Sequence, residues 1–443
     1  MIHNLHEAIW GSGMLALFLG VGLLYSLRLG LFPLLKFPRW WRATAGSLLQ
    51  KKETGADGGI TQFQSACTAL AATIGTGNIA GVATALLAGG PGAIFWMWVS
   101  AFIGMATAYG ETELGIRYRE KGADGSWMAG PMLYLEKGVK SRAAAMLYAF
   151  LCMTASFGMG SMVQANAISE TLEFNFSLPP LIAAAVLTVV CGFIIGGGAK
   201  RIAGTAERLV PVSAAIYMTA CVFVIVLFRE KLPAAFGRIF SEAFSFRQAA
   251  AGVSGYGVLQ CVRYGVARGV FSNEAGLGSM AVLNGSAEQA PPGVQGQWAI
   301  FEVFFDTIVS CTMTALVILC TMGNGLADFR GNGAALTGSC FSMGLGNLGG
   351  YTVSMCVALF AFATIIAWYY MGKQAASYLG SKLGRNLAGV HFFGYLGAVF
   401  LGGMGPMEAV WEVSDIFNGL MAVPNLLALV ILVREVRAPG SGE

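Results

Sequence analysis

Two short stretches combine glycine, asparagine and a hydroxyl residue inside long apolar segments. The first is GTGN at residues 75–78, and the second is FSNEAG at residues 271–276, roughly 200 residues later. Because glycine weakens a helix, both stretches predict a helix that is broken in mid-membrane. A broken helix exposes amide N–H groups at the start of one half and carbonyl groups at the end of the other. These groups suit a carboxylate and a sodium ion respectively.

A packing role for these glycines is the competing interpretation, since membrane helices place small residues where neighbouring helices approach closely. We expect that role at Gly89, Gly158 and Gly160. Two breaks in equivalent places, each with an asparagine and a hydroxyl residue, favour binding at residues 75–78 and 271–276 instead. Interrupted hydrophobic segments in matching positions are a sequence sign of a transporter's binding site at the membrane midplane.

Charged residues inside apolar segments are the second set that could do chemistry, because a charge in a membrane interior is costly. Arg263 and Arg268 lie in the seventh apolar segment. Glu408, Glu412 and Asp415 repeat at helical spacing near the start of the last one. We expect either an outer ionic gate between these two helices or a static ion pair.

Five further acidic residues admit more than one role. Glu274 lies within the second break, and Glu302 and Asp306 lie in the segment that follows it. These three either carry a proton or an ion, or accept backbone N–H groups where the helices unwind. Glu111 and Glu113 stand near the end of the third segment, so we expect them at the membrane interface.

The composition defines the environment in which these residues act. The chain has 443 residues, of which 56% are hydrophobic and 11% are charged, and its mean hydropathy is +0.66. Soluble domains carry far more charge, so the sequence predicts an integral membrane protein. Its apolar runs reach the roughly 20 residues of a spanning helix and lack the alternation of barrel strands. The expected fold class is therefore an all-α membrane bundle in a lipid bilayer.

The sequence gives little support for a bound metal cofactor or for a nucleic-acid partner. The nine cysteines are scattered through apolar runs, and the three histidines, His3, His6 and His391, have no partner at metal-ligand spacing. The net charge of +4 is small, and the basic residues sit in loops rather than in one run. We therefore expect no resident transition metal and no nucleic-acid partner.

Apolar periods bounded by glycine, proline and charged clusters predict about eleven spans. They lie near residues 9–35, 60–88, 92–118, 143–172, 179–197, 206–228, 253–287, 296–322, 350–376, 388–403 and 410–433. After one additional span, five spans begin at residue 60 and five more at about residue 253. An odd number of spans in each copy gives the two copies opposite topology.

This arrangement divides the chain into five expected units. They are an additional span with a basic loop (1–59), a first five-span repeat (60–228), an external loop with an amphipathic helix (229–252), a second repeat (253–433) and a tail (434–443). Of the 27 lysines and arginines, twenty fall on one side of this scheme and five on the other. Since short cytoplasmic loops are rich in these residues, we expect the N-terminus outside and the C-terminus in the cytoplasm, at the plasma (inner) membrane.

The stretch GGPGAIFWMWVSAFIG at residues 89–104 resembles the signature of the sodium:alanine (alanine or glycine:cation) symporter family along its whole length. GTGNIAG, FSNEAG and the FAFAT…W stretch at residues 360–368 also resemble that family. The resemblance covers essentially the whole chain. It implies a LeuT-type fold, with ten core spans in two inverted five-span repeats plus one additional span. It also implies sodium-driven import of small neutral amino acids such as alanine and glycine.

Carried over onto matching positions, the resemblance also implies a substrate pocket and a sodium site. Thr76 and Gly77 would receive the substrate carboxylate, and Ile365 and Trp368 would close the pocket. The other implied substrate positions are Asn78, Gln164, Phe271, Ser272, Asn273 and Gly276. The co-transported sodium ion would bind at Ala71, Ile74, Ala361 and Thr364, with Asn78 beside both ligands. Ala363 departs from the pattern, since many relatives have serine beside that threonine.

Other functions stay open at this point. A proton-coupled carrier of amino acids is the closest alternative. A channel would need a ring of repeated pore-lining groups and usually a symmetric oligomer, and the inverted repeat argues against it. A membrane-embedded enzyme is weaker still, because no Ser/His/Asp set or HExxH motif is visible. The sequence gives no indication of the oligomeric state.

Overall fold

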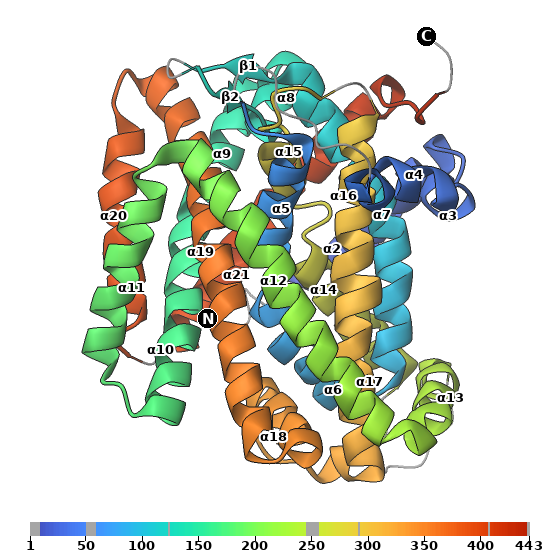
Figure 1. The fold of residues 1–443 in the computed structure, drawn as a ribbon. Helices are drawn as coiled ribbons and strands as arrows, with labels where there is room; N and C mark the ends of the chain where they lie inside the picture. The colour runs from blue at the N-terminus through green and yellow to red at the C-terminus, as the bar shows by residue number, and fades with distance from the viewer. Residues whose placement is uncertain are drawn as a thin grey trace.

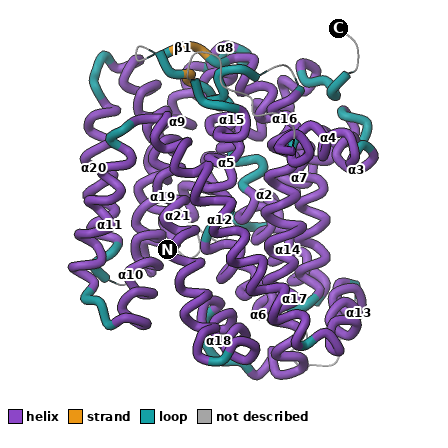
Figure 2. Tube along the Cα trace, in the orientation of Figure 1, coloured by secondary structure: helices purple, strands orange, loops and turns teal. Residues whose placement is uncertain are grey.

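The computed structural model describes residues 9–49, 59–122, 125–244, 257–290, 293–405 and 408–440. They form a bundle of long helices that run between two ends (Figure 1). Nearly all of the described chain is helical (Figure 2). The two short strands, β1 (Glu120–Lys121) and β2 (Trp127–Met128), form an antiparallel pair at one end of the bundle. We call this end, which also carries Arg119 and the end of the last helix, the basic end.

Helices occupy each segment that was predicted to span the membrane. The uninterrupted ones are α2 (Ser12–Arg28), α7 (Gly92–Tyr118), α11 (Pro180–Ile195), α12 (Gly198–Leu227), α19 (Asn347–Leu383), α20 (Leu387–Gly402) and α21 (Glu408–Leu432). Within the described residues, six continuous helices are long and apolar enough to cross a membrane, and a bent pair makes a seventh. The prediction of an all-α bundle with many spans is confirmed.

Two further spans contain π-helical turns. The turn Gly158–Met162 joins α9 (Arg142–Phe157) to α10 (Val163–Phe176), and the turn Phe304–Cys311 joins α16 (Val294–Val303) to α17 (Thr312–Met322). A π turn adds a residue to a helical turn, and such turns are frequent at functional sites. Glycine is needed at position 160, because a Cβ there would lie 2.4 Å from the Cβ of Trp368.

Both predicted breaks are present. The first separates α5 (Gln62–Thr73) from a π-helical turn (Gly77–Gly81) and α6 (Val82–Gly89), and the two halves meet at a bend of 50°. The second separates α14 (Val258–Asn273) from α15 (Ser279–Asn284). Between these helices Glu274, Gly276 and Gly278 take φ angles of 56°, 97° and 87°. Glycine adopts such left-handed conformations readily, which is why the chain can turn here.

Shorter helices cover the two ends of the bundle. The basic end carries α3 (Phe32–Leu35), α4 (Phe37–Ala43), α8 (Pro131–Lys137) and the 3₁₀ turns Ala45–Leu49 and Val433–Glu435. The opposite end carries α13 (Leu232–Ala243), α18 (Gly333–Leu345) and the 3₁₀ turns Arg229–Lys231 and Gly323–Asp328. α13 falls in the loop where we expected an amphipathic helix, and residues 245–252 of that loop lie outside the described residues. α18 has no counterpart among the sequence predictions.

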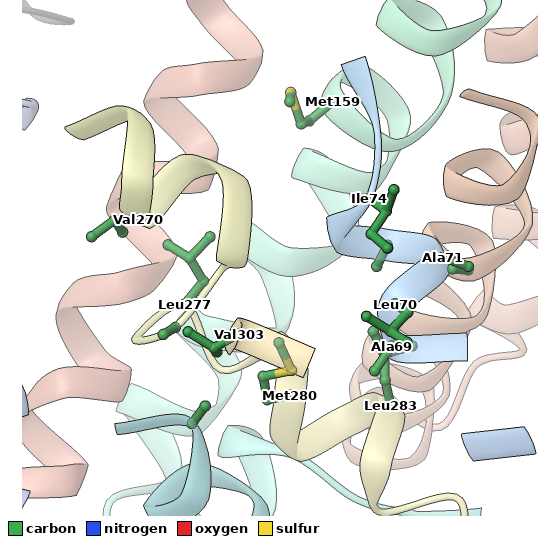
Figure 3. Close-up of a cluster of buried hydrophobic side chains, with 14 of the residues drawn as sticks. Ala69, Leu70, Ala71, Ile74, Met159, Val270, Leu277, Met280, Leu283 and Val303 are labelled. Carbon is green, nitrogen blue, oxygen red and sulfur yellow. The ribbon is translucent and has the colours of Figure 1, made fainter. Parts of the chain in front are cut away.

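The two broken spans lie at the centre of the bundle. α7 packs against α14, α15 and α16, and α19 packs against α5, α9, α10 and α12. Apolar side chains fill the space around both breaks, among them Ile74, Val270 and Leu277 (Figure 3). This surrounding core excludes water from the breaks, so the polar groups there must find partners within the protein.

Candidate functional site

The two breaks meet directly, although their sequences are far apart. A Cβ placed at Gly77 would lie 3.6 Å from the ring of Phe271 and 3.7 Å from the Cα of Ser272. Gly77 and Phe271 are half-buried, whereas Thr76 and Ser272 are buried. Three of the predicted substrate positions, Gly77, Phe271 and Ser272, therefore lie at one point of contact between the broken spans.

The first break owes its shape to a side chain that replaces a helical hydrogen bond. α5 starts with a capping box between Thr61 and Gln64, and it ends where Ile74 turns to an extended conformation, with φ −74° and ψ 93°. The Gly75 N–H then donates to Asn78 Oδ1 at 2.9 Å. Residues 76 and 77 are thereby held at the start of the helical run that ends at Gly89. The amide groups and the dipole at such a start favour an anion.

Asp306, on the π-helical turn Phe304–Cys311, ties the two breaks together. Its Oδ1 accepts a hydrogen bond from Asn78 Nδ2 at 2.6 Å, and its Oδ2 accepts one from Ser272 Oγ at 2.8 Å. Thr307 Oγ1 also donates to Oδ2 at 2.8 Å, and Asn273 Nδ2 donates to Thr307 Oγ1 at 3.1 Å. The carboxylate thus bonds to side chains of both broken spans rather than to unwound backbone. An acidic residue in an apolar, aromatic-rich span was the only sequence signal for this role.

Two of the predicted sodium positions, Ala71 and Thr364, meet where α19 crosses the end of α5. Thr364 Oγ1 lies 3.0 Å from the carbonyl oxygen of Ala71 and 3.0 Å from that of Phe360. A Cβ at Gly75 would lie 3.1 Å from the same hydroxyl oxygen. Ile74 and Ala361 are buried in the same region, with exposed fractions of 1% and 0%. Carbonyl and hydroxyl oxygens therefore face one another at this helix crossing.

Trp368 and Ile365 belong to the interior of the bundle. Trp368 is only 1% exposed and packs against Gly160 of the π-helical turn Gly158–Met162. Tyr395 Oη of α20 lies 2.7 Å from the Ile365 carbonyl oxygen and 3.0 Å from that of Gly160. This tyrosine, which the sequence analysis did not single out, joins α20 to both helices that carry the predicted pocket residues.

Gln164 has one polar atom that stays unpaired within the described structure. Its Nε2 donates to the carbonyl of Met159 at 3.2 Å, but its Oε1 has no hydrogen-bond partner. The side chain is 1% exposed. A buried amide oxygen without a donor is uncommon, so this atom is available to a ligand that carries N–H groups.

Glu111 corrects one expectation, because it is fully buried rather than interfacial. Its Oε1 accepts the N–H of Gly278 at 3.0 Å and a hydrogen bond from Asn425 Nδ2. Asn425 Nδ2 also donates to the Gly276 carbonyl at 2.9 Å. Glu113 is half-buried and accepts the N–H of Gly293, just before α16. The interfacial expectation fails for Glu111 because the backbone at the second break needs a buried acceptor.

The predicted gate residues lie on the two expected helices, α14 and α21. Arg263 and Arg268 each lie over an aromatic ring of α14, at 5.9 Å from the Tyr264 centroid and 5.5 Å from the Phe271 centroid. Glu412 and Asp415 are half-buried on α21, and the side chain of Glu408 lies outside the described residues. The ionic gate therefore stays a prediction.

The basic end fastens the two broken spans to each other. Ser65 Oγ donates to the Leu283 carbonyl at 2.9 Å, which joins α5 to α15. The N–H of Glu288 donates to the Ile60 carbonyl at 2.9 Å. Arg119 donates to the carbonyls of Gly285, Ala287 and Glu288, and its guanidinium lies 4.0 Å from the centre of the Trp127 ring. These contacts hold α5 and α15 together at this end of the bundle.

A cavity of about 330 Å³ lies between the π-helical turn Gly158–Met162 and the first turns of α21. Its lining is mainly apolar and consists of Thr154, Gly158, Met162, Val410, Val413, Ser414 and Phe417. The predicted substrate residues do not line it. The polar groups at the breaks are instead packed closely against one another.

A family model described as the sodium:alanine symporter family matches residues 1–439. The chain belongs to this family. It is similar to the sodium/alanine symporter AgcS of Methanococcus maripaludis, with 39% identity over 98% of this chain and 94% of AgcS. It is also similar to the probable sodium/glutamine symporter GlnT of Bacillus subtilis, with 35% identity over 97% of this chain and 87% of GlnT.

Among solved structures, the fold is similar to that of MhsT in complex with L-phenylalanine. The TM-score is 0.60 at 13% sequence identity, and the match covers 86% of this chain and 90% of that one. The sodium:alanine symporter family member described here therefore has the LeuT-type fold. It is a membrane transporter of the amino-acid symport class rather than an enzyme.

Proposed function

We propose that this protein imports small neutral amino acids, alanine and glycine, by sodium-coupled alternating access. The observation that carries the proposal is the meeting of the two broken spans at Gly77 and Phe271, with the Thr364 hydroxyl facing the end of α5 a short distance away. A transporter needs a ligand site at mid-membrane that either end can reach, and broken helices supply its polar groups.

The substrate would be held by its two charged ends. Its carboxylate would bind at Thr76 and Gly77, where the helix that ends at Gly89 begins. Its ammonium group would bind carbonyl or side-chain oxygens of residues 271–276 and the unpaired Oε1 of Gln164. Phe271, Ile365 and Trp368 are large, so the space left for the substrate side chain would suit a hydrogen or a methyl group.

Sodium would bind where Thr364 crosses α5. The carbonyl oxygens of Ala71, Ile74 and Ala361, with the Thr364 hydroxyl, form a ligand set of neutral oxygens that suits a hard monovalent cation. The Thr364 hydroxyl already lies 3.0 Å from one of these oxygens. Asn78 bonds to Gly75 and to Asp306, so it connects this region to the second break.

The membrane orientation and the gates belong to the same proposal. The basic end would face the cytoplasm, with the C-terminus inside and the N-terminus outside the plasma (inner) membrane. The contacts of Ser65 and Arg119 would then form the closed inner gate. Arg263 and Arg268, with Glu412 and Asp415, would lie toward the outer gate.

Uptake into proteoliposomes tests the proposal. Labelled alanine should accumulate when sodium is placed outside, and replacing sodium with potassium should abolish accumulation at every pH. Glycine should compete with alanine. Accumulation driven by a pH gradient without sodium would instead establish the proton-coupled alternative, and a flux that does not saturate would indicate a channel.

A further inference from the structure

The second break carries a carboxyl group within the turn itself. Glu274 takes the left-handed conformation, with φ 56°, although it is not glycine. Its side chain is 4% exposed and lies beside the hydroxyl of Ser279 and the indole of Trp368. An ionisable side chain thus lies in the buried centre of the bundle, next to Trp368 of the proposed pocket.

A second carboxyl group, that of Glu111 on α7, lies on the other side of the same turn. One of its oxygens, Oε1, is used by Gly278 and Asn425, but the other, Oε2, has no hydrogen-bond partner among the described residues. Oε2 of Glu274 also has no hydrogen-bond partner among the described residues. Each of the two carboxyl groups at this turn therefore keeps one oxygen that is buried without a partner.

Among the described residues, the titratable groups that act on these two carboxyls carry no positive charge. Asp306 faces Glu274 from the π-helical turn of residues 304–311, and Tyr148 and Cys152 face it from α9. Tyr134 of α8 and Tyr25 of α2 face Glu111. Neither carboxyl forms an ion pair within the described part of the chain. Burying one ionised carboxylate without a cationic partner costs free energy. Two ionised carboxylates in the same buried region would also repel each other.

We propose that Glu274 and Glu111 form a proton-binding site, with the proton held on the Glu274 carboxyl. Protonation removes one of the two buried charges, and it converts an acceptor oxygen of Glu274 into an O–H donor. The ligand of this site is a proton rather than a metal ion, because among the described residues no group of three or more His, Cys, Asp or Glu side chains could hold a metal ion.

The site would exchange its proton during transport. Glu274 lies in the break whose two halves must separate from their neighbours when either end of the bundle opens. Opening admits water, which favours the ionised carboxylate, and closing favours the protonated acid. This step rests on the proposed function, since it assumes that the broken spans move in an alternating-access cycle.

Infrared spectroscopy of the purified full-length protein tests the site without requiring transport. The wild type should show a carbonyl stretching band of a buried carboxylic acid that disappears as pH is raised. Glu274→Gln should lose that band. The matched control, Glu230→Gln, removes an exposed carboxyl and should leave it unchanged. A band that survives in Glu274→Gln, or one removed by sodium at constant pH, would overturn the proton site.

Uptake measurements then test exchange of the proton. At saturating sodium, the wild-type alanine uptake rate should change about fivefold or more between roughly pH 5.5 and pH 8.5, because the ratio of carboxylate to acid changes tenfold for each pH unit. Glu274→Gln should show less than about a twofold change. If this variant does not transport, the pH dependence of alanine binding to the purified protein is compared instead. An equal pH dependence in both proteins would contradict proton exchange at Glu274, whereas absence of sodium-driven uptake in the wild type would contradict only the proposed function.

Discussion

At the crossing of α19 and α5, the proposed sodium site depends on a single side chain. Thr364 is the one side-chain oxygen among the four implied sodium ligands, and it already faces the Ala71 carbonyl. Removing it costs about 1–3 kcal/mol for one unsatisfied ligand position, so Thr364→Ala should raise the half-saturating sodium concentration by about fivefold to 150-fold. The measurement is alanine uptake against sodium concentration.

Thr352 of the same helix provides the control for Thr364. Its hydroxyl donates to the Leu348 carbonyl within an exposed part of α19. Thr352→Ala should leave the sodium dependence unchanged. Equal sodium dependence in wild type and Thr364→Ala would remove Thr364 from the ion site.

Trp368 tests what determines substrate size. It is buried against Gly160, so it cannot serve as a membrane-interface anchor. Overpacking a closed pocket costs about 1–3 kcal/mol, and we therefore expect glycine and alanine, but not leucine, to compete for wild-type uptake. Trp368→Leu should admit valine and leucine as competitors while alanine binding weakens. Identical inhibition profiles in the two proteins would place Trp368 outside the pocket.

The sequence indicated these residues only in part. Glycines and asparagines inside apolar segments predicted both breaks because local conformational cost is visible in sequence. The partners of Asp306 were not predictable, since its bond to Asn78 joins residues 228 positions apart. Glu111 was wrongly predicted to lie at the membrane interface for the same reason. Its burial depends on a hydrogen bond from Gly278, which is 167 positions away.

At the scale of elements, the π-helical turn of residues 158–162 sets how closely α9 can approach α19. A Cβ at Gly160 would overlap the Cβ of Trp368, whose position is fixed by the surrounding core. Gly160→Ala should lower the thermal unfolding temperature in detergent and reduce uptake, since overpacking of this kind costs about 1–3 kcal/mol. Gly397→Ala on α20 has no neighbour within 4 Å and should change neither measurement. Equal stability of both variants would show that α19 can shift away from the turn.

Arg119 holds the segment after α15 closed at the basic end. Its loss removes hydrogen bonds to the carbonyls of Gly285 and Glu288 and the stacking on Trp127. We expect Arg119→Ala to open this end more often and to increase thiol labelling of Cys67, which is 1% exposed on α5. Arg208→Ala, which changes an exposed arginine of α12, is the control and should not increase it. Unchanged labelling in Arg119→Ala would show that other contacts keep this end closed.

The sequence predicted the helices correctly where an apolar segment was continuous. Every predicted span coincides with helix, but α12 begins at Gly198, eight positions before the span predicted from residue 206. Its first turns carry Lys200 and Arg201, which hydropathy assigned to a loop. α18 was missed because its glycine-rich sequence is too short to span a membrane, and tertiary packing against α19 stabilises it.

For the whole molecule, the uneven distribution of basic residues predicts one orientation. A reporter that works only in the cytoplasm should be active when fused after Glu443, because twenty basic residues fall on that side. The same reporter inserted within residues 229–252 should be inactive. Activity at the second position alone would reverse the proposed topology and, with it, the assignment of the inner gate.

The contact of Asp306 with both broken spans also bears on how the protein is made. Asn78 enters the membrane long before the ribosome reaches Asp306, and an amide side chain in lipid without a partner is unfavourable. We therefore expect the first broken span to reach its final packing only after the second half of the chain has been inserted. Biogenesis would then include a late step, in which the two halves of the chain pack around the Asp306 carboxylate.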